Sequence, residues 1–435
     1  MENKQPRGLW FIYVVEIWER FAYYGVRAII MLYMVKGLFF STQKAGQVYG
    51  LYTGLVYMSA LLGGYMADRY LGARKSILSG AVLMAIGYFI MMIPKPMFFF
   101  IAIGFIIFGS GFFKPNITAN LGMLYEKRDL RRDSGFTFFY QSINVGAMVA
   151  PLLCSYLGER VGWKYGFLAS GIGMAIGTLI FLWGQNKYLG DHGKLPTYKP
   201  KAEQKEAQPP LTRQEKHKVA VIFIMMFFTI FFWMAFEQKG SSLMLFAFND
   251  TNRIIPLINW EMPAGWFLVL NPFIIVILAP LFSKMWVSLA RKKMDPSAPI
   301  KFVIGLLLAG LGFIAMIFAA KIVGATGGKV TVFWLMFVYL CHTLGELCLS
   351  PVGLSLVSKL SPTRFLSLMF GVWLTATAIA NYAAGVFAGN YETMDHAKFF
   401  MVPAAICIGA AFVLLLCSKW IKRWMHGADD DNIKA

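Results

Sequence analysis

The chain has 435 residues, of which 58% are hydrophobic and only 14% are charged, and its mean hydropathy is +0.58. A soluble domain is about half apolar and about a quarter charged, so this composition excludes a soluble globular protein. The formal net charge of +19 would by itself allow nucleic-acid binding, but the positions of the basic residues argue against that role.

Twelve apolar stretches follow one another along the chain. A helix needs about 20 residues to cross the hydrocarbon core of a bilayer, and each stretch is long enough. The predicted spans are 8–36, 45–69, 74–94, 97–125, 134–158, 163–187, 217–247, 262–286, 300–322, 331–358, 364–390 and 398–424. The sequence therefore predicts an all-α membrane protein with twelve transmembrane helices.

A long polar segment separates the sixth span from the seventh and divides the chain into two halves. We expect an N-terminal six-helix bundle at 1–187, a cytoplasmic linker at 188–216 and a C-terminal six-helix bundle at 217–435. A basic cluster at 291–293 after the eighth span repeats the basic residues at 74–75 after the second span. Such a repeat is typical of transporters built from two related bundles around a central cavity.

The basic residues gather on one side of the predicted membrane. Of the 41 Lys and Arg residues, 28 lie in or beside the segments on the side of both termini, and ten lie on the opposite side. Cytoplasmic segments carry such an excess of Lys and Arg. We therefore expect a multi-pass protein of the cell inner (plasma) membrane with both termini in the cytoplasm, and no nucleic-acid partner.

The first span carries charged residues that lipid does not tolerate. At 100° per residue, Glu16, Arg20, Tyr23 and Arg27 lie on one narrow helix face, with Glu19 beside it. A charge at the bilayer centre costs about 2.5–3.5 kcal/mol on insertion scales. This face must therefore line protein or water.

Other spans add one charged residue each: Lys114, Glu237 and Glu346. Together with the first span, they make three cations and four carboxylates, so one carboxylate is in excess. Burial and a nearby like charge both favour the protonated form of a carboxyl group, which points to proton coupling. The alternative is that these charges only pair to hold helices together. Two further polar residues within spans are Asn144 and Asn271.

The remaining reactive residue types give no catalytic or metal site. His342 lies one helical turn before Glu346, where it either tunes that carboxyl group or is a packing residue. The five cysteines lie in apolar stretches without the spacing of a disulfide framework or a zinc site. We therefore expect no metal, no catalytic residues and no enzymatic activity.

Several motifs resemble known transporters. The segment Gly64…Asp68-Arg69…Gly72…Arg74-Lys75 resembles the signature of the major facilitator superfamily. Other motifs resemble the proton-coupled oligopeptide transporter family: Glu16-x-x-Glu19-Arg20-Phe21-x-Tyr23-Tyr24, the sequence around Lys114, Phe139-Tyr140-x-x-Ile143-Asn144-x-Gly146, and Gly345-Glu346 followed by Pro351-x-Gly353.

The resemblance implies a major facilitator fold and import of di- and tripeptides by alternating access, driven by an inward proton gradient. It implies a monomer in contact with membrane lipid, with protons as the coupling ion and no other cofactor. It assigns proton coupling to Glu16, Glu19, Arg20 and Glu237. It assigns the peptide carboxylate to Arg20, Arg27 and Lys114, and the peptide amine to Asn144, Asn271 and Glu346.

The resemblance also implies two gate ion pairs, Arg27 with Glu237 and Lys114 with Glu346. Aromatic residues are expected to form the pocket walls: Tyr23, Tyr24, Tyr57, Trp233 and Trp373. Two features depart from the family pattern. The linker is too short for the two extra helices of many bacterial relatives, and Phe236 stands where some relatives have an acid.

Three other functions compete with peptide import. A transporter of nitrate or an organic anion is disfavoured, because an anion needs no acidic residues for its binding. A non-transporting sensor would need a signalling domain, and the tail after Trp424 is short. A membrane enzyme would need a nucleophile and base or a metal site, and no such arrangement is visible.

Overall fold

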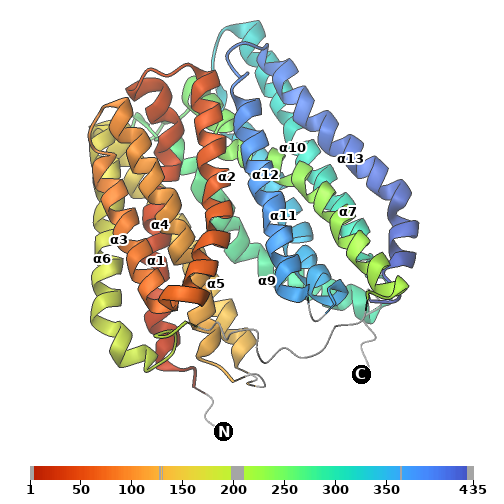
Figure 1. The fold of residues 1–435 in the computed structure, drawn as a ribbon. Coiled ribbons are helices and arrows are strands. Elements are labelled where there is room, and N and C mark those ends of the chain that lie inside the picture. Colours follow the sequence, from red (N-terminus) through yellow and green to blue (C-terminus); the bar gives the residue numbers. More distant parts are fainter. Residues whose placement is uncertain (1–3, 127–128, 130, 197–209, 363–364, 429–435) are drawn as a thin grey trace. The chain divides into compact units, whose positions relative to one another are not determined.

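The computed structural model describes residues 4–126, 129, 131–196, 210–362 and 365–428 (Figure 1). Within them, twelve helices have 18 residues or more. They are α1 (Arg7–Leu32), α2 (Thr42–Met66), α3 (Ala73–Ile90), α4 (Pro96–Met123), α5 (Arg132–Tyr156), α6 (Trp163–Leu189), α7 (Arg213–Phe236), α9 (Leu270–Arg291), α10 (Ala298–Thr326), α11 (Phe333–Leu360), α12 (Leu366–Ala388) and α13 (His396–Trp424).

Shorter elements extend or join these helices. The π-helical turns η1 (Tyr33–Gly37), η2 (Ala67–Leu71) and η3 (Leu157–Val161) follow α1, α2 and α5. The remaining short elements are the 3-10 turns η5 (Glu237–Gly240) and η6 (Ala264–Val269), helix α8 (Ser242–Asn249), and strands β1 (Thr251–Asn252), β2 (Ile254–Ile255), β3 (Trp260–Glu261) and β4 (Val330–Thr331). Strand β1 pairs in parallel with β4, and β2 pairs with β3.

All twelve predicted spans are present, and most of their ends differ by a few residues. The eighth, predicted at 262–286, begins as the 3-10 turn η6 and continues as α9, which starts eight residues later than predicted. Among the residues that the structure describes, ten helical segments, at α3 to α7 and α9 to α13, are long and apolar enough to cross a membrane. The seventh span differs from the prediction of one continuous helix at 217–247. It is divided into α7, the turn η5 and α8, because the helical backbone ends at Glu237 and resumes at Ser242.

Unit 1 comprises Met1–Ser41, Tyr52–Lys205 and Glu261–Pro272. In its described part, α1 packs against α5 and α6, and α3 packs against α4 and α6 (Figure 1). Helix α5 approaches α1 closely at Gly146, where an added Cβ would lie 2.6 Å from the Cβ of Arg20. The missing side chain at Gly146 thus lets the backbone of α5 lie directly against the charged face of α1.

Unit 2 comprises Thr42–Leu51, Glu206–Trp260 and Phe273–Ala435. Helix α10 packs against α11 and α13, and α7 packs against α12. Buried aromatic rings such as Phe302 and Phe313 fill the space between these helices. The first turns of α2 belong to this unit and meet α12 through facing glycines, since a Cβ on Gly46 would lie 2.4 Å from the carbonyl oxygen of Gly385.

Each unit contains one short stretch from the other half of the chain, namely Thr42–Leu51 in unit 2 and Glu261–Pro272 in unit 1. The boundaries 1–187, 188–216 and 217–435 stay predictions. Helix α6 ends at Leu189, and a capping box of Thr212 and Glu215 begins α7. The middle of the predicted linker, 197–209, lies outside the described residues.

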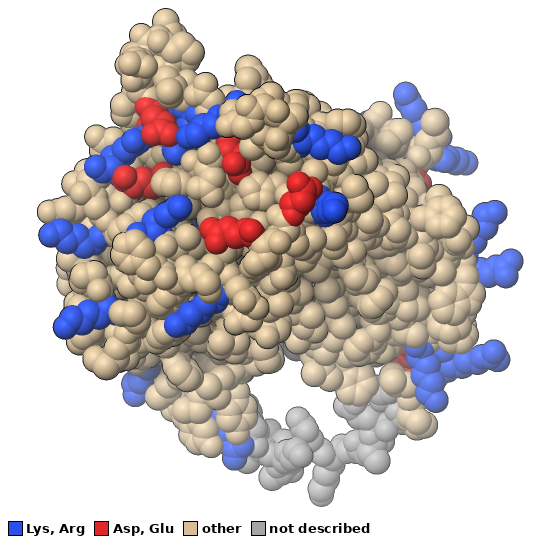
Figure 2. All heavy atoms as spheres, turned by 90° about the horizontal axis from the view of Figure 1, so that it is seen from above, with Lys and Arg blue, Asp and Glu red and all other residues tan. Residues whose placement is uncertain are grey.

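Charged side chains on the face seen from above are of both signs (Figure 2). Red and blue side chains lie beside one another there, between broad areas of uncharged surface. One exposed pair is Arg160 with Glu261, whose side-chain atoms Nη2 and Oε2 are 3.0 Å apart. Exposed pairs of this kind contribute at most about 1 kcal/mol to stability.

Candidate functional site

The charged residues of α1 form a buried ion cluster in unit 1. The Nε atom of Arg20 lies 2.9 Å from Oε1 of Glu16 and also contacts Oε2 of Glu19. The exposed fraction of each of these three residues is 3% or less. Two carboxylates thus share one guanidinium away from water. Removing either kind of charge would leave the other buried without a partner, which costs free energy of folding. The cluster carries a formal excess of one negative charge when both carboxyl groups are ionised.

Lys114 supplies a second cation on α4. Its Nζ atom lies 4.2 Å from the centre of the Tyr57 ring, and it interacts electrostatically with both Glu16 and Glu19. Lys114 and Tyr57 are both half-buried. The structure therefore places Lys114 within electrostatic reach of the α1 cluster.

The aromatic residues of α1 lie next to this cluster. The guanidinium carbon of Arg20 is 5.7 Å from the centre of the Tyr23 ring. Tyr23 also contacts Tyr24 edge to face, with centroids 5.3 Å apart, and Tyr52 on α2, with centroids 6.5 Å apart. Tyr23 is buried and Tyr24 is half-buried, so Tyr24 is the one that keeps accessible surface.

Arg27 and Asn144 complete the predicted residues of α1 and α5. Arg27 is 5% exposed and lies two helical turns after Arg20. Asn144 is 8% exposed, and its Nδ2 donates a hydrogen bond to the carbonyl oxygen of Tyr140 at 3.1 Å. This bond to the preceding helical turn fixes the orientation of the amide.

Asn271 lies in unit 1 because the segment before it is attached to the end of α5. The two carboxylate oxygens of Glu159 accept hydrogen bonds from the backbone N–H groups of Ala264 and Gly265, at 2.8 and 3.0 Å. The indole N–H of Trp266 donates to the carbonyl oxygen of Leu152 at 3.0 Å. These bonds hold η6, and Asn271 follows directly as the second residue of α9.

In unit 2, Glu237 lies at the break after α7 and is 3% exposed. The side chain of Gln238 links this break to α12 and to the start of α8. Its Nε2 donates to the carbonyl oxygen of Ala384 on α12 at 3.1 Å, and its Oε1 accepts from the hydroxyl of Ser242 at 2.6 Å. The break that positions Glu237 is therefore a hydrogen-bonded structure and not a frayed helix end.

Lys239 is a charged residue of this break that the sequence analysis did not select. Its Nζ lies 3.6 Å from the centre of the Phe236 ring, and its carbonyl oxygen accepts a hydrogen bond from the Tyr339 hydroxyl at 3.3 Å. The residue is half-buried. Its position within the apolar stretch 217–247 was the signal that could have identified it. Phe236, the departure from the family pattern, thus provides a ring face for a cation.

His342 is surrounded by aromatic rings. Its ring centroid is 4.9 Å from that of Phe313 and 6.3 Å from that of Phe236, and the residue is 3% exposed. A hydrogen bond connects it to the backbone of Ala309. These contacts support the interpretation of His342 as a packing residue.

The other predicted residues of unit 2 lie on α7, α11 and α12. Glu346 and Trp233 are half-buried, and Trp233 contacts Phe236 edge to face with centroids 5.1 Å apart. Trp373 is 5% exposed and packs against Phe302, at 6.4 Å between centroids. The gate pairs Arg27–Glu237 and Lys114–Glu346 join residues of different units and stay predictions. Among the described residues, no three His, Cys, Asp or Glu side chains are grouped to hold a metal ion.

Comparison with known proteins places this arrangement among transporters. The family model described as the POT family matches residues 74–196 and 199–402. The peptide transporter YePEPT of Yersinia enterocolitica is 33% identical, over 97% of this chain and 95% of that protein. A di-/tripeptide transporter of Lactococcus lactis subsp. cremoris is 29% identical, over 97% of both chains.

Solved structures give the same result. A crystal structure of the peptide transporter POT in complex with sulfate superposes with a TM-score of 0.90 at 30% identity, covering 98% of this chain and 97% of that chain. A POT family transporter in complex with 5-aminolevulinic acid superposes with a TM-score of 0.89 at 30% identity, covering 97% and 98%. These superpositions confirm the predicted major facilitator fold.

Proposed function

Because the chain belongs to the POT family, we propose that it imports di- and tripeptides together with protons by alternating access. The observation that carries the proposal is the buried cluster in which Glu16 and Glu19 share Arg20, beside the cation Lys114. The names of the relatives, a peptide transporter and a di-/tripeptide transporter, support the choice of substrate.

The substrate is a zwitterion, so its two ends need groups of opposite charge. In the proposal, the cations Arg20, Arg27 and Lys114 bind the peptide carboxylate. Glu346 binds the amine, together with the amide oxygens of Asn144 and Asn271. Tyr24, Tyr57 and Trp233 keep partly accessible ring surfaces and contact the variable side chains of the peptide.

In the proposal, proton coupling arises because the carboxylates of Glu16 and Glu19 compete with the peptide carboxylate for Arg20. Protonation of Glu16 or Glu19 removes one of its two anionic partners, which leaves more of the guanidinium charge for the peptide carboxylate. Protonation of Glu237 in the outward-open state frees Arg27 in the same way, and the outer gate closes once the peptide is bound. Loss of the proton restores the competition and releases the peptide. Only such a difference in binding between states can drive transport.

We propose in addition that the protein is a monomer in the inner membrane with both termini in the cytoplasm. The excess of Lys and Arg on the side of the termini supports this orientation. Protons are the coupling ion and no other cofactor takes part. The absence of an enzymatic role belongs to the same proposal, since the family and the relatives are transporters.

Uptake into proteoliposomes tests the proposal. Purified protein is reconstituted, and accumulation of labelled dialanine is measured under an imposed pH gradient, acidic outside. We expect Glu19→Gln to lose gradient-driven accumulation and to keep exchange of labelled for unlabelled dialanine, because exchange needs no net proton movement. Glu392→Gln, which alters an exposed carboxylate after α12, is the matched control. Unchanged gradient-driven uptake in Glu19→Gln would overturn the assignment of the coupling site.

A further inference from the structure

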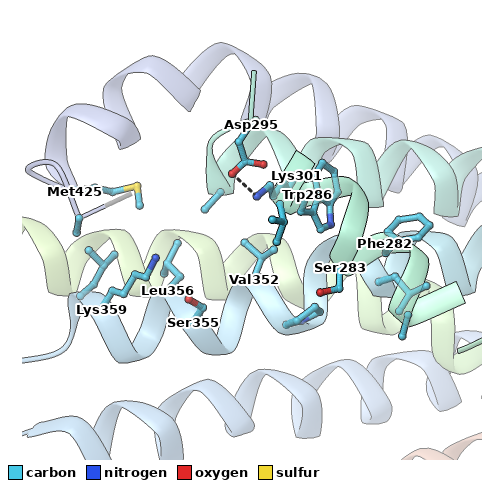
Figure 3. Close-up of a pocket in the computed structure, with 17 residues that line it drawn as sticks. Phe282, Ser283, Trp286, Asp295, Lys301, Val352, Ser355, Leu356, Lys359 and Met425 are labelled. Atoms are coloured by element: carbon cyan, nitrogen blue, oxygen red, sulfur yellow. Dashed lines mark hydrogen bonds and ion pairs between the residues drawn. The ribbon is translucent and has the colours of Figure 1, made fainter. Parts of the chain in front are cut away.

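Unit 2 contains a pocket that none of the predicted substrate residues lines. It has a volume of about 410 Å³ and lies between α9, α10 and α11, near the end of α13 (Figure 3). Its size falls within the usual range of about 300–1,000 Å³ for ligand pockets. The walls are largely apolar, and include Phe282 on α9 and Pro351 and Val352 on α11.

The polarity of the pocket changes along its length. On α11 the lining runs from Leu347 to Leu360, a rise of about 20 Å along the helix. Lys359 lies in the last turn of α11, and Lys301 lies in the first turn of α10. The pocket is therefore elongated, with charged groups at the helix ends and apolar groups farther in. This is the polarity of an amphiphile and not that of a zwitterionic peptide.

Two hydrogen-bond donors of the pocket, the ammonium of Lys301 and the indole N–H of Trp286, lie next to each other. The Nζ atom of Lys301 lies 2.8 Å from Oδ2 of Asp295 and 4.7 Å from the centre of the Trp286 ring. The indole N–H of Trp286 is buried and has no hydrogen-bond partner among the described residues. A buried donor without a partner costs about 1–3 kcal/mol, so a bound group with an acceptor oxygen would be favoured there. Figure 3 shows Trp286 facing the same space as Val352 and Leu356 of α11.

The surroundings of the pocket favour a negatively charged lipid. The segment at Ala264–Arg291, which contains α9, is the least buried of the ten candidate membrane spans, and its apolar side chains Val276 and Leu281 are more than half exposed. Three basic residues lie at or just after the end of α9: Arg291, Lys292 and Lys293. Basic pockets between transmembrane helices on the cytoplasmic side bind anionic headgroups.

We propose that this pocket binds an anionic phospholipid of the cytoplasmic leaflet. An acyl chain lies along Phe282, Pro351 and Val352, and an ester carbonyl accepts the indole N–H of Trp286. The phosphate is held chiefly by the ammonium group of Lys359, while Lys301 stays paired with Asp295 and offsets the charge of that carboxylate. The choice of leaflet rests on the membrane orientation proposed above. The binding itself is independent of the peptide site.

Native mass spectrometry of the purified full chain tests the proposal. Delipidated protein in detergent is mixed with phosphatidylglycerol or phosphatidylcholine of the same acyl composition. We expect occupancy by phosphatidylglycerol to exceed that by phosphatidylcholine at least about fivefold, and Lys359→Gln to lower it about fivefold, as the loss of one basic contact implies. Trp286→Phe keeps the ring and removes the N–H, so it should lower the occupancy by both lipids.

Three controls make the test decisive. Lys284→Gln removes an exposed lysine of α9 that does not line the pocket and should leave the occupancy unchanged, whereas Lys359→Arg should restore it. Thermal unfolding without lipid verifies that each variant is folded. Equal occupancy by the two lipids, or no effect of Lys359→Gln, overturns the proposal.

A soluble phosphate compound distinguishes a lipid-binding pocket from a pocket for soluble anions. Glycerol 3-phosphate has the headgroup chemistry without acyl chains, and we expect it neither to raise the melting temperature nor to displace phosphatidylglycerol. If it stabilises the protein as much as the lipid does, the pocket is a soluble-anion site and the lipid proposal is wrong. Peptide uptake is measured separately, so failure of the transport proposal and failure of the lipid proposal are distinguishable.

Discussion

The ammonium nitrogen of Lys114 on α4 lies 4.2 Å from the centre of the Tyr57 ring on α2. A cation over an aromatic face gains about 0.5–2 kcal/mol, depending on how far water is excluded. The ring face attracts the cation without acting as a conventional acceptor for its N–H donors. Tyr57 can thus position Lys114 for an anionic group such as a peptide carboxylate.

Replacement of Tyr57 distinguishes this role from a general packing role. Tyr57→Leu removes the aromatic face, and we expect the KM for dialanine uptake to rise about 2- to 30-fold, which corresponds to the loss of the cation–π contact. Tyr57→Phe keeps the face and should stay close to the unmodified protein. The measurement is the concentration dependence of labelled dialanine uptake. Equal defects in both variants would show that the hydroxyl group matters and the ring face does not.

The carboxylate of Glu159 holds the segment that leads into α9, because it accepts hydrogen bonds from the backbone N–H groups of Ala264 and Gly265. Glu159→Gln leaves only one acceptor oxygen for two donors, so we expect a loss of about 1–3 kcal/mol in the free energy of unfolding. Glu261→Gln, which alters the exposed pair with Arg160 in the same region, should cost less than about 1 kcal/mol. Thermal unfolding in detergent compares the two variants. Similar losses in both would argue against a special role for Glu159.

The close approach of α2 and α12 in unit 2 depends on Gly46. A Cβ there would lie 2.4 Å from the carbonyl oxygen of Gly385, so Gly46→Ala forces the helices apart and should cost about 1–3 kcal/mol. Gly324 on α10 is the matched control, since no atom lies within 4 Å of an added Cβ. Gly324→Ala should leave stability unchanged or raise it by up to about 1 kcal/mol, because alanine favours a helix. A melting temperature of Gly46→Ala equal to that of the unmodified protein would contradict this packing.

The phenol of Tyr391, in the loop between α12 and α13, donates a hydrogen bond to Oδ2 of Asp250 at 2.8 Å. His396 stacks on the same ring, with centroids 4.2 Å apart. Burial, and secondly the negative charge of Asp250, raise the pKa of Tyr391 well above its ordinary value of 10.0. The folded protein therefore keeps this phenol neutral at a pH at which the unfolded chain ionises it.

The sign of the pH dependence follows from that raised pKa. Below about pH 10, both states hold the proton, and the hydrogen bond makes the unmodified protein about 1 kcal/mol more stable than Tyr391→Phe. Above about pH 10, ionisation favours the unfolded state, so this advantage shrinks as the pH rises toward the folded-state pKa. Unfolding midpoints of both proteins between pH 8 and 11 provide the measurement. A difference that stays constant over this range would contradict the prediction.

The sequence was sufficient to predict the twelve long helices and the shared face of α1, because apolar length and helical periodicity are local properties. It did not predict the break at Glu237. Apolar residues lie on both sides of this point, so the length criterion merges α7 with α8, although the polar segment 237–242 with its glycine is a local signal for a break. The side chain that stabilises the break, Gln238, bonds to Ala384, which is 146 residues away in the chain. A contact of that separation has no local signal.

The grouping of short segments was also beyond sequence reasoning. Thr42–Leu51 belongs to unit 2 and Glu261–Pro272 to unit 1, although no change in composition marks these points. The grouping of Glu261–Pro272 depends on the bond between Glu159 and the backbone of η6, and a carboxylate at the end of a span could equally have faced water. For Lys239, the sequence shows a basic residue inside a predicted span. It does not show that the side chain is half-buried.

The turn at Glu237–Gly240 has a mechanical consequence. A continuous helix resists bending, because a change of direction breaks hydrogen bonds between successive turns. Here the regular α-helix has already given way to a 3-10 turn, and the amide of Gln238 connects this turn to the carbonyl oxygen of Ala384 on α12 and to the hydroxyl of Ser242. A change in the angle between α7 and α8 at this joint would therefore disrupt fewer regular helical hydrogen bonds than a bend within a continuous helix would. Stiffening the joint would slow the transport cycle without weakening the binding of its cargo.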